Sequence, residues 1–519
     1  MSSRLKFYVL LLVLISGTLP AQDQKEISLI NIKSNLEFLA DDLLEGREAT
    51  TRGEKLASLY ISKELQKYGV QPFGDNGTYF QEFDMSLSGF NPDSYVQLDK
   101  NGNSEKLLPG EDFIFSSRNK PGIKYSGISG EIVFAGYGVT ATDFEYDDYK
   151  NIDVNGKYVL VYDDIPESES DSIFSPSKHR RLGFWGTKAK IAADHGAIGI
   201  FIIAAGNTLE YWDYYSSVVT RPSFKLYDST GTSEPDYTAI PTIGLNRRGL
   251  EKLLEGEKIS ADELLRSAGK MDIPQPFEIN KKAKSIYSYF SRIEKAGNVI
   301  GILEGADYNL KNEYVALSAH YDHEGIKGNK IYNGADDDGS GTVGVLETAR
   351  LLTKAGNNKR SVVFIFHTGE EKGLLGSKYL TSHAEWLPNT VAEINMDMIG
   401  RESIDSIHCI GSDKLSTEFF NLVEKVNNDG DYFTFDYRFN ADNDPNRFYW
   451  RSDHVHYAEK GIPIVFFFDY MKADYHKPTD TVEKINFEKI YKVSKLCEGI
   501  ILEVANQDHK VVVDKSFSR

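Results

Sequence analysis

The stretch that most constrains the fold of this 519-residue chain is residues 315–377. It contains two apolar runs, VALSA (315–319) and VVFIF (362–366), and ionisable residues follow each run at once. A Gly/Asp-rich turn, NGADDDGSG (333–341), lies between the two runs. Apolar runs of this length that alternate with helical segments are typical of buried strands in a parallel sheet. We therefore predict an open α/β sheet with reactive groups at the carboxyl ends of its strands.

The residues that follow these runs have the chemistry of metal ligands. His320 ends the first run, and Asp322 is placed to accept the other ring N–H of that histidine. Glu370 and Glu371 follow the second run, and Asp337 lies in the glycine-rich turn. Imidazole and carboxylate together suit zinc, whereas sets of oxygen ligands suit magnesium or calcium. The pattern therefore indicates a metal site, and a catalytic one.

Two further candidates lie downstream. Asp397 ends a strand expected at 391–396, and His476 follows a buried strand expected at 462–468. A hydrolase with two metal ions needs a bridging carboxylate, a histidine and an acid for each ion, and a separate base for the water. The candidate residues supply one complete set of this kind.

Strand and helix patterns alternate from residue 298 onward, as in a parallel α/β unit. Before them, a second unit of strands with one helix begins near Tyr125, and its polar residues show no ligand spacing. In the later unit we expect strands at 298–303, 315–319, 361–366, 391–396 and 462–468, and helices at 341–352, 373–382, 417–426 and 487–504.

Composition excludes several kinds of protein. The formal net charge is −18, which argues against nucleic-acid binding because that needs a basic patch or stripe. The two cysteines, Cys409 and Cys497, are too few for a disulfide framework. We predict that both are buried thiols, since cysteine is among the most buried residue types.

The N-terminus has the features of a secretory signal peptide. Arg4 and Lys6 precede an apolar run at 7–15, and a small-residue region ends near Ala21. This run is much shorter than the roughly 20 residues that cross a bilayer. We therefore predict a signal peptide over residues 1–21, export to the periplasm or the extracellular space, and no membrane span after its removal.

Six segments, taken together and in this order, resemble the M28 family of zinc metallopeptidases, the aminopeptidase and glutamate-carboxypeptidase-like group. FLADDLLEGR (38–47) extends the resemblance toward the N-terminus. The resemblance implies a mixed, mostly parallel sheet sandwiched by helices, the phosphorylase/hydrolase-like fold of zinc exopeptidases. The six segments are AHYDHEG (319–325), NGADDDGSG (333–341), GEEKGLLGS (369–377), NMDMIGR (395–401), RSDHVHYAEKGIPI (451–464) and YHKPTDT (475–481).

A second resemblance concerns residues 120–246, which are similar to a protease-associated domain. It rests on GKYVLVYDD (156–164), KAKIAADHGAIGIFII (188–203) and IPTIGLN (240–246). The two resemblances imply a peptidase domain formed by residues 25–119 and 247–510. A β-rich protease-associated domain would be inserted between these parts.

The M28 resemblance also implies a role for each candidate. His320 and Asp397 are expected to bind one Zn²⁺ ion, and Glu371 and His476 the other. Asp337 is expected to bridge the two ions. Glu370 corresponds to the general base. Tyr475 matches a tyrosine that stabilises the oxyanion in some relatives.

Other polar residues near these motifs have simpler interpretations. Asp336 and Asp338 are expected to be loop acids or helix-capping groups. Asp453 is expected to support the site from outside. Arg401 could contact substrate or pair with a carboxylate. Three further histidines are not expected to bind metal because the ligand set is already complete: His323, His367 and His454.

The expected function is that of an exported di-zinc aminopeptidase acting on peptides. A carboxypeptidase would need arginines for the C-terminal carboxylate. The candidates are Arg401, Arg447 and Arg451, and nearby aspartates could neutralise the last two. A glutaminyl cyclase, which uses one zinc ion on the same fold, is a further alternative. A non-catalytic binding protein is disfavoured because no ligand and no base is missing.

Overall fold

The computed structural model describes residues 21–517, except residues 92, 117–126, 142–144, 167–180, 228–239, 287, 402 and 471–472. Residues 1–20 of the signal peptide predicted at 1–21 lie outside the described residues. Among the helices that are described, none combines the length and the apolar character needed to cross a membrane.

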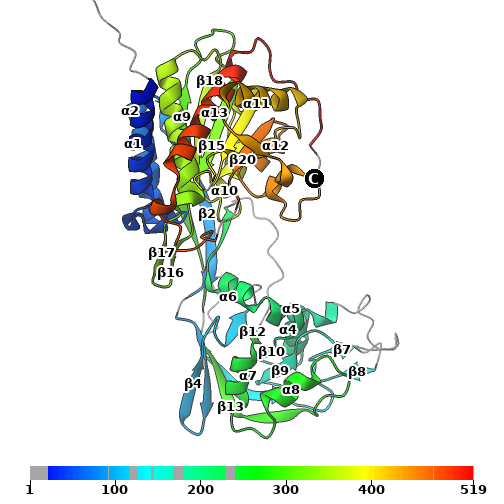
Figure 1. The fold of residues 1–519 in the computed structure, drawn as a ribbon. Helices are drawn as coiled ribbons and strands as arrows, with labels where there is room; N and C mark the ends of the chain where they lie inside the picture. Colours follow the sequence, from blue (N-terminus) through cyan, green and yellow to red (C-terminus); the bar gives the residue numbers. More distant parts are fainter. Residues whose placement is uncertain are drawn as a thin grey trace, which may run out of the picture. The chain divides into compact units, whose positions relative to one another are not determined.

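The chain forms two compact units (Figure 1). The first unit contains residues 1–83 and 295–519, and the second contains residues 84–294. Both boundaries fall inside long strands, β2 (Phe80–Phe90) and β14 (Tyr289–Leu303). The second unit is thus inserted into the first along the sequence.

The first unit has a mixed sheet in the order β14-β18-β15-β19-β22-β20-β21. Its centre is parallel: β15 (Tyr314–His320) pairs with both β18 (Ser361–His367) and β19 (Thr390–Met396), and β19 pairs with β22 (Ile464–Phe468). Toward the edges, β14 runs antiparallel to β18 and β20 (Ser406–Ile410) antiparallel to β22, whereas β21 (Thr434–Asp436) is parallel to β20. The mixed, mostly parallel sheet predicted from the sequence is confirmed.

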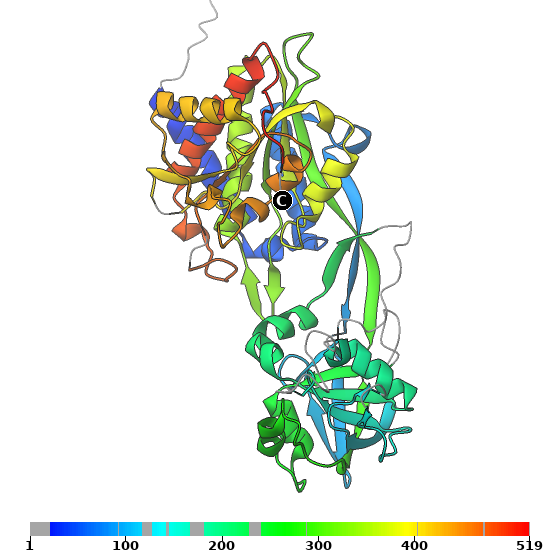
Figure 2. The same cartoon turned by 90° about the vertical axis from the view of Figure 1, so that its right-hand side faces the viewer.

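Helices cover both faces of this sheet, which explains why its central strands are mostly apolar and buried along almost their whole length (Figures 1 and 2). Successive side chains of a strand point to opposite faces, so Val362, Phe364 and Phe366 join one core and Val363 and Ile365 the other. The first core also contains side chains from α1 (Ala21–Leu39), α2 (Arg52–Tyr68), α9 (Gly341–Ala355), α11 (Thr417–Gly430) and α13 (Phe487–Asn506). The second core contains side chains from α10 (Leu375–His383) and α12 (His454–Ala458).

The second unit contains an eight-stranded sheet in the order β4-β3-β13-β6-β9-β10-β12-β5. Four neighbouring strands at its centre are parallel: β6 (Ile128–Phe134), β9 (Tyr158–Tyr162), β10 (Gly199–Ile203) and β12 (Thr242–Leu245). The remaining strands are β3 (Tyr95–Lys100), β4 (Asn103–Leu107), β5 (Phe113–Phe115) and β13 (Phe277–Ile286). Its helices include α4 (Trp185–Asp194), α7 (Arg247–Leu254) and α8 (Ala261–Ser267).

The second unit is larger than the insertion expected at 120–246. Residues 84–119 and 247–294, which we assigned to the peptidase domain, belong to the second unit instead. The physical reason is strand pairing, because β3, β4, β5 and β13 complete the sheet that the central strands begin. Cys409 and Cys497 are both buried and unpaired, as predicted.

Candidate metal centre

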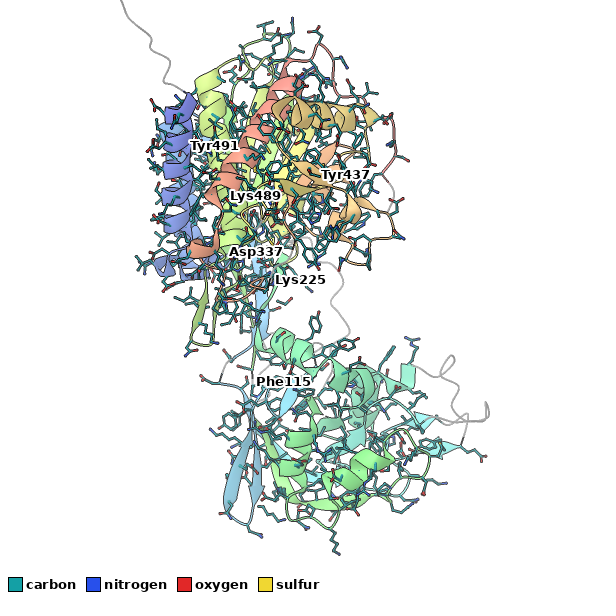
Figure 3. All side chains as sticks on the ribbon, viewed as in Figure 1. Phe115, Lys225, Asp337, Tyr437, Lys489 and Tyr491 are labelled. Carbon is teal, nitrogen blue, oxygen red and sulfur yellow. The ribbon has the colours of Figure 1, made fainter. Side chains whose placement is uncertain are left out.

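The predicted ligands lie together in the first unit, where Asp337 is labelled in Figure 3. His320 is the last residue of β15, and Asp397 directly follows β19. His320 Nε2 lies 3.4 Å from Asp337 Oδ1 and 3.6 Å from Asp397 Oδ1. These three buried side chains are close enough to hold one metal ion.

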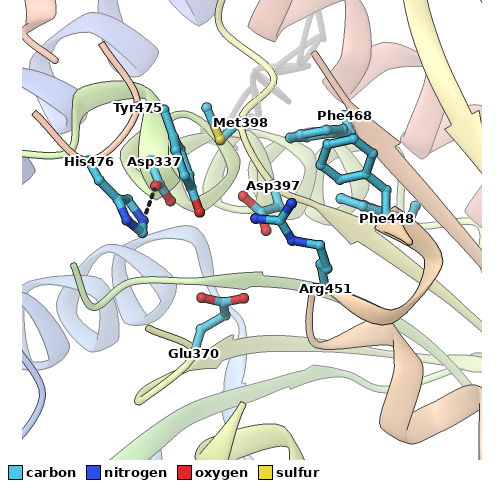
Figure 4. A pocket seen from close by; sticks show the side chains of 10 residues that line it. Asp337, Glu370, Asp397, Met398, Phe448, Arg451, Phe468, Tyr475 and His476 are labelled. Carbon is cyan, nitrogen blue, oxygen red and sulfur yellow. Dashed lines mark ion pairs between the residues drawn. The ribbon is translucent and has the colours of Figure 1, made fainter. Parts of the chain in front are cut away.

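A second set of donors surrounds the other oxygen of Asp337. His476 Nε2 lies 3.2 Å from Asp337 Oδ2 (Figure 4) and 3.0 Å from Glu371 Oε2. Asp337 therefore presents one oxygen to His320 and the other to His476. A carboxylate that bridges two ions needs this arrangement.

The turn that carries Asp337 is held in place by its two neighbouring acids. Asp337 lies in a single turn of π-helix, η4 (Ala335–Ser340). The Asp338 carboxylate accepts hydrogen bonds from the backbone N–H groups of His320 at 3.2 Å and Met398 at 3.0 Å. Asp336 Oδ1 accepts one from the N–H of Gly400 at 2.9 Å. Both acids fix loops, in agreement with the interpretation from the sequence.

Arg401 and Asp480 connect this turn to the segment that carries His476. The Asp480 carboxylate accepts hydrogen bonds from the backbone N–H groups of Asp336 and Asp337 at 3.0 and 3.1 Å. Arg401 Nη2 lies 2.5 Å from Asp480 Oδ1, and Arg401 Nε lies 3.4 Å from Asp336 Oδ2. Arg401 is buried, so of the two roles left open by the sequence, pairing with carboxylates is the one observed.

Residues 298–501 match the model of Peptidase family M28. The unit that carries this site belongs to peptidase family M28. The chain is therefore a hydrolase of the peptidase class.

Known relatives agree with this assignment. The chain is 26% identical over 303 residues to a probable leucine aminopeptidase of Arthroderma benhamiae, covering 53% of this chain and 81% of the relative. It is 25% identical over 313 residues to aminopeptidase YwaD of Bacillus subtilis, covering 57% of this chain and 63% of the relative.

Two solved structures share the fold. One is an aminopeptidase from Aneurinibacillus sp. strain AM-1, with a TM-score of 0.52 and 20% identity over 95% of this chain and 98% of that one. The other is BSAP, a zinc aminopeptidase from Bacillus subtilis, with a TM-score of 0.51 and 20% identity over 94% and 98%.

We call the first unit, residues 1–83 and 295–519, the M28 unit. The chemistry of its donor side chains fits a metal ion. Asp337 Oδ2 and Glu371 Oε1 are buried and accept no hydrogen bond within the described part of the chain. Buried polar atoms without a partner are destabilising by about 1–3 kcal/mol each, and more when charged. A cation at these oxygens would remove that cost, and the two imidazoles favour zinc over magnesium or calcium.

Glu370 and Tyr475 line the cavity beside these donors (Figure 4). Glu370 Oε2 lies 3.9 Å from His320 Nε2, and burial raises the pKa of this carboxyl well above its usual range. The Tyr475 ring stacks on that of His476, with 3.8 Å between the ring centroids. Both residues therefore lie beside the predicted metal ligands.

Apolar side chains also line the cavity. They are Met398, Phe448, Phe466 and Phe468, and Arg451 lies beside Phe448 in the same cavity (Figure 4). Arg451 also lies over the Phe448 ring, 5.0 Å from its centroid. A substrate side chain would therefore meet aromatic and methionine surface beside the metal donors.

The two residues expected to support the site have different surroundings. His320 Nδ1 lies 3.1 Å from the backbone oxygen of Asp322 and 3.7 Å from its Oδ1. The closer acceptor is thus the carbonyl, and Asp322 Oδ1 accepts the N–H of Glu370 at 3.1 Å instead. Asp453 is fully buried, and burial is the main cause that raises its pKa to about 7.

His323, which was not expected to bind metal, and Glu324, which the sequence did not single out, both lie against the donors. His323 is close enough to Asp337 and Glu371 to hold a metal ion with them. His323 Nδ1 is 2.8 Å from Glu371 Oε1, and Glu324 Oε1 is 3.3 Å from His476 Nδ1. The sequence feature that could have identified these two residues is their position directly after Asp322 in HYDHEG (320–325). His367 contacts the Tyr457 hydroxyl and His454 the carbonyl of Tyr449, away from the donors.

Proposed function

We propose that this chain is an exported, zinc-dependent aminopeptidase that removes single residues from the N-termini of peptides. The observation that carries the proposal is the Asp337 carboxylate, which lies between two sets of donors in a unit of family M28. The names of the relatives, leucine aminopeptidase and zinc aminopeptidase, support the same activity. Export rests on the signal peptide predicted at residues 1–21.

In this proposal His320 and Asp397 would hold one Zn²⁺ ion, Glu371 and His476 would hold the other, and the Asp337 carboxylate would serve both. Bound zinc supplies Lewis acidity, which polarises the scissile carbonyl and makes a water nucleophilic near neutral pH. Asp322 and Asp453 hold the surroundings of His320 in place.

Glu370 is the proton carrier of the reaction. Its carboxylate takes a proton from the attacking water and returns it to the leaving amine. A raised pKa suits this role because it brings the base closer to the working pH. The Tyr475 hydroxyl, on the same cavity, donates a hydrogen bond to the oxyanion.

The charge of the cavity supports an N-terminal substrate. Asp337, Glu370 and Asp397 face it and suit a free α-amine. Arg401, which could have bound a C-terminal carboxylate, is buried against Asp336 and Asp480. A carboxypeptidase is the second candidate because Arg451 lines the same cavity.

One experiment separates these activities. The zinc-loaded protein is incubated with a peptide that has a free N-terminus and with its N-acetylated twin, and products are identified by mass spectrometry. We expect loss of single N-terminal residues from the free peptide alone. Equal trimming of both peptides from the C-terminal end would establish the carboxypeptidase. Loss of ammonia from a peptide that begins with Gln would establish the glutaminyl cyclase.

A further inference from the structure

Glu324 lies at the Nδ1 edge of the His476 ring, and its carboxylate lies within 4.8 Å of a donor atom of Glu371. His476 Nε2 is turned toward Asp337 and Glu371, and Nδ1 lies 3.3 Å from Glu324 Oε1. Glu324 immediately precedes the hairpin of β16 (Gly325–Lys327) and β17 (Lys330–Tyr332). The residue before the hairpin thus places a carboxylate beside Nδ1 of His476.

The Glu324 carboxylate is itself held in place. Lys327 Nζ lies 2.6 Å from Glu324 Oε2, while Oε1 is the oxygen turned toward His476. Lys327 lies over the Tyr332 ring of the same hairpin, 4.4 Å from the ring centroid. Only 10% of the Glu324 side chain is exposed. Because one oxygen is fixed by the lysine, the other has a defined direction toward the histidine.

His476 needs such support more than His320 does. The His476 side chain is 30% exposed, whereas that of His320 is 1% exposed. His320 ends a central strand and has the Asp322 carbonyl at its Nδ1. His476 lies on a loop with a left-handed backbone, φ 51°. Its ring direction therefore depends on side-chain contacts rather than on a strand.

We infer that Glu324 is a positioning residue for His476. Its carboxylate accepts a hydrogen bond from Nδ1–H, which fixes the tautomer and leaves the Nε2 lone pair directed at the second metal position. Outer carboxylates of this kind orient a histidine ligand and raise its basicity. The inference rests on the proposed zinc site and adds a residue to which nothing else assigns a role.

The first test measures zinc affinity by competition with chelators of graded strength. Glu324→Ala should weaken binding of the more weakly held ion about 10- to 100-fold. Lys327→Met keeps the carboxylate and should weaken it less than Glu324→Ala. Glu304→Gln breaks a Glu–Lys pair of similar length but greater exposure, with Lys311 at 2.7 Å, and should leave zinc affinity unchanged. Unchanged affinity in Glu324→Ala, or an equal loss in Lys327→Met, would overturn the inference.

A second test observes the hydrogen bond itself. In the protein loaded with Co²⁺, the ring N–H proton of each histidine ligand gives a shifted NMR signal that exchanges with water. Glu324→Ala should speed exchange of the His476 signal and leave that of His320 unchanged. Equal exchange rates in Glu324→Ala and wild type would contradict the assignment.

The two failures are distinguishable. If the wild-type protein binds fewer than two zinc ions or hydrolyses no peptide, the proposed function is wrong. If the wild type does both while Glu324→Ala matches it in zinc affinity and N–H exchange, only the role of Glu324 is wrong.

Discussion

Glu370 and Glu371 are adjacent in the chain, yet their surroundings give them opposite acidities. Burial raises the pKa of Glu370 well above its usual range. Glu371 is buried too, but the imidazoles of His323 and His476 beside it hold its pKa well below that range. Carboxyls whose environments separate their pKa values take different roles in catalysis. These surroundings fit a general base at Glu370 and a metal ligand at Glu371.

Substitution should separate the two roles. Glu370→Gln should keep zinc near the wild-type content and lower kcat about 10²–10⁴-fold, because it removes a general base. Glu371→Gln should lose zinc. Metal analysis and kcat of both purified variants check this, and equal loss of zinc in the two would show that Glu370 is a ligand.

Asp337 can be tested against its own neighbour. Asp337→Asn should reduce the occupancy of both zinc ions, because a bridging carboxylate gives negative charge to each. Asp336→Asn is the matched control, since its oxygen can still accept the N–H of Gly400. Metal analysis should find close to wild-type zinc in the control. Full zinc in Asp337→Asn would move the bridge to another carboxylate.

Because of Lys188, the stability of the second unit should depend on pH. Burial lowers its pKa from 10.5 to about 8, and its Nζ donates to the carbonyl of Tyr137. Between these two values the unfolded chain binds the proton and the folded chain does not. Stability should therefore rise with pH from about 8 toward 10.5, by up to about 3 kcal/mol. Hydrogen exchange of peptides from β9 and β10 measures this, and the rise should be absent in Lys188→Met.

At the scale of elements, the segment after β22 is tied to turn η4 through Arg401. The guanidinium lies against Asp336 of the turn and Asp480 of the later segment. Both carboxylates are buried. Removing the arginine leaves them without a counter-charge, which costs about 3–5 kcal/mol for a buried pair.

Arg401→Met should therefore lower the free energy of unfolding of the M28 unit by about 3–5 kcal/mol and weaken zinc binding. Arg401→Lys keeps the positive charge but loses the several N–H donors of the guanidinium, and it should have a smaller effect. Denaturant unfolding and zinc titration test both variants. Unchanged stability with a raised KM in Arg401→Met would mean that this residue contacts substrate instead.

The sequence predicted the elements of the M28 unit because its strands are local apolar runs. The run 315–319 lies within β15, and 361–366 lies within β18. The residues at the ends of these strands meet because parallel strands place their carboxyl ends at one edge. His323 and Glu324 follow no such periodicity, so the direction of their side chains was not predictable. Only the folded loop shows that they face Glu371 and His476.

The predicted boundaries of the second unit were wrong because they depend on pairing between distant segments. Residues 95–99 pair with residues 282–286, which lie far away in the sequence. No local pattern in either segment specifies its partner. The similarity of residues 120–246 to a protease-associated domain covers the central parallel strands but not the strands that flank them. That similarity stays a prediction.

At the scale of the whole molecule, all the donors described above lie in the M28 unit, and none lies in residues 84–294. Replacing residues 84–294 by a short turn should therefore leave zinc binding intact. We expect two zinc ions per chain and hydrolysis of dipeptide substrates, with a changed KM for longer peptides. Metal analysis and kinetics of this variant are the measurement. A folded variant that binds no zinc would show that the second unit contributes to the site.

The place where the chain leaves and re-enters the M28 unit has a consequence for how such proteins arise. β2 and β14 are neighbours in the sheet. The N–H of Ile300 donates to the carbonyl of Tyr79, and Gly297 lies against Gln81. β2 and β14 are thus antiparallel, as in a hairpin whose tip has been replaced by a domain. A single genetic event at that tip could add or remove the second unit without shifting any strand of the M28 sheet.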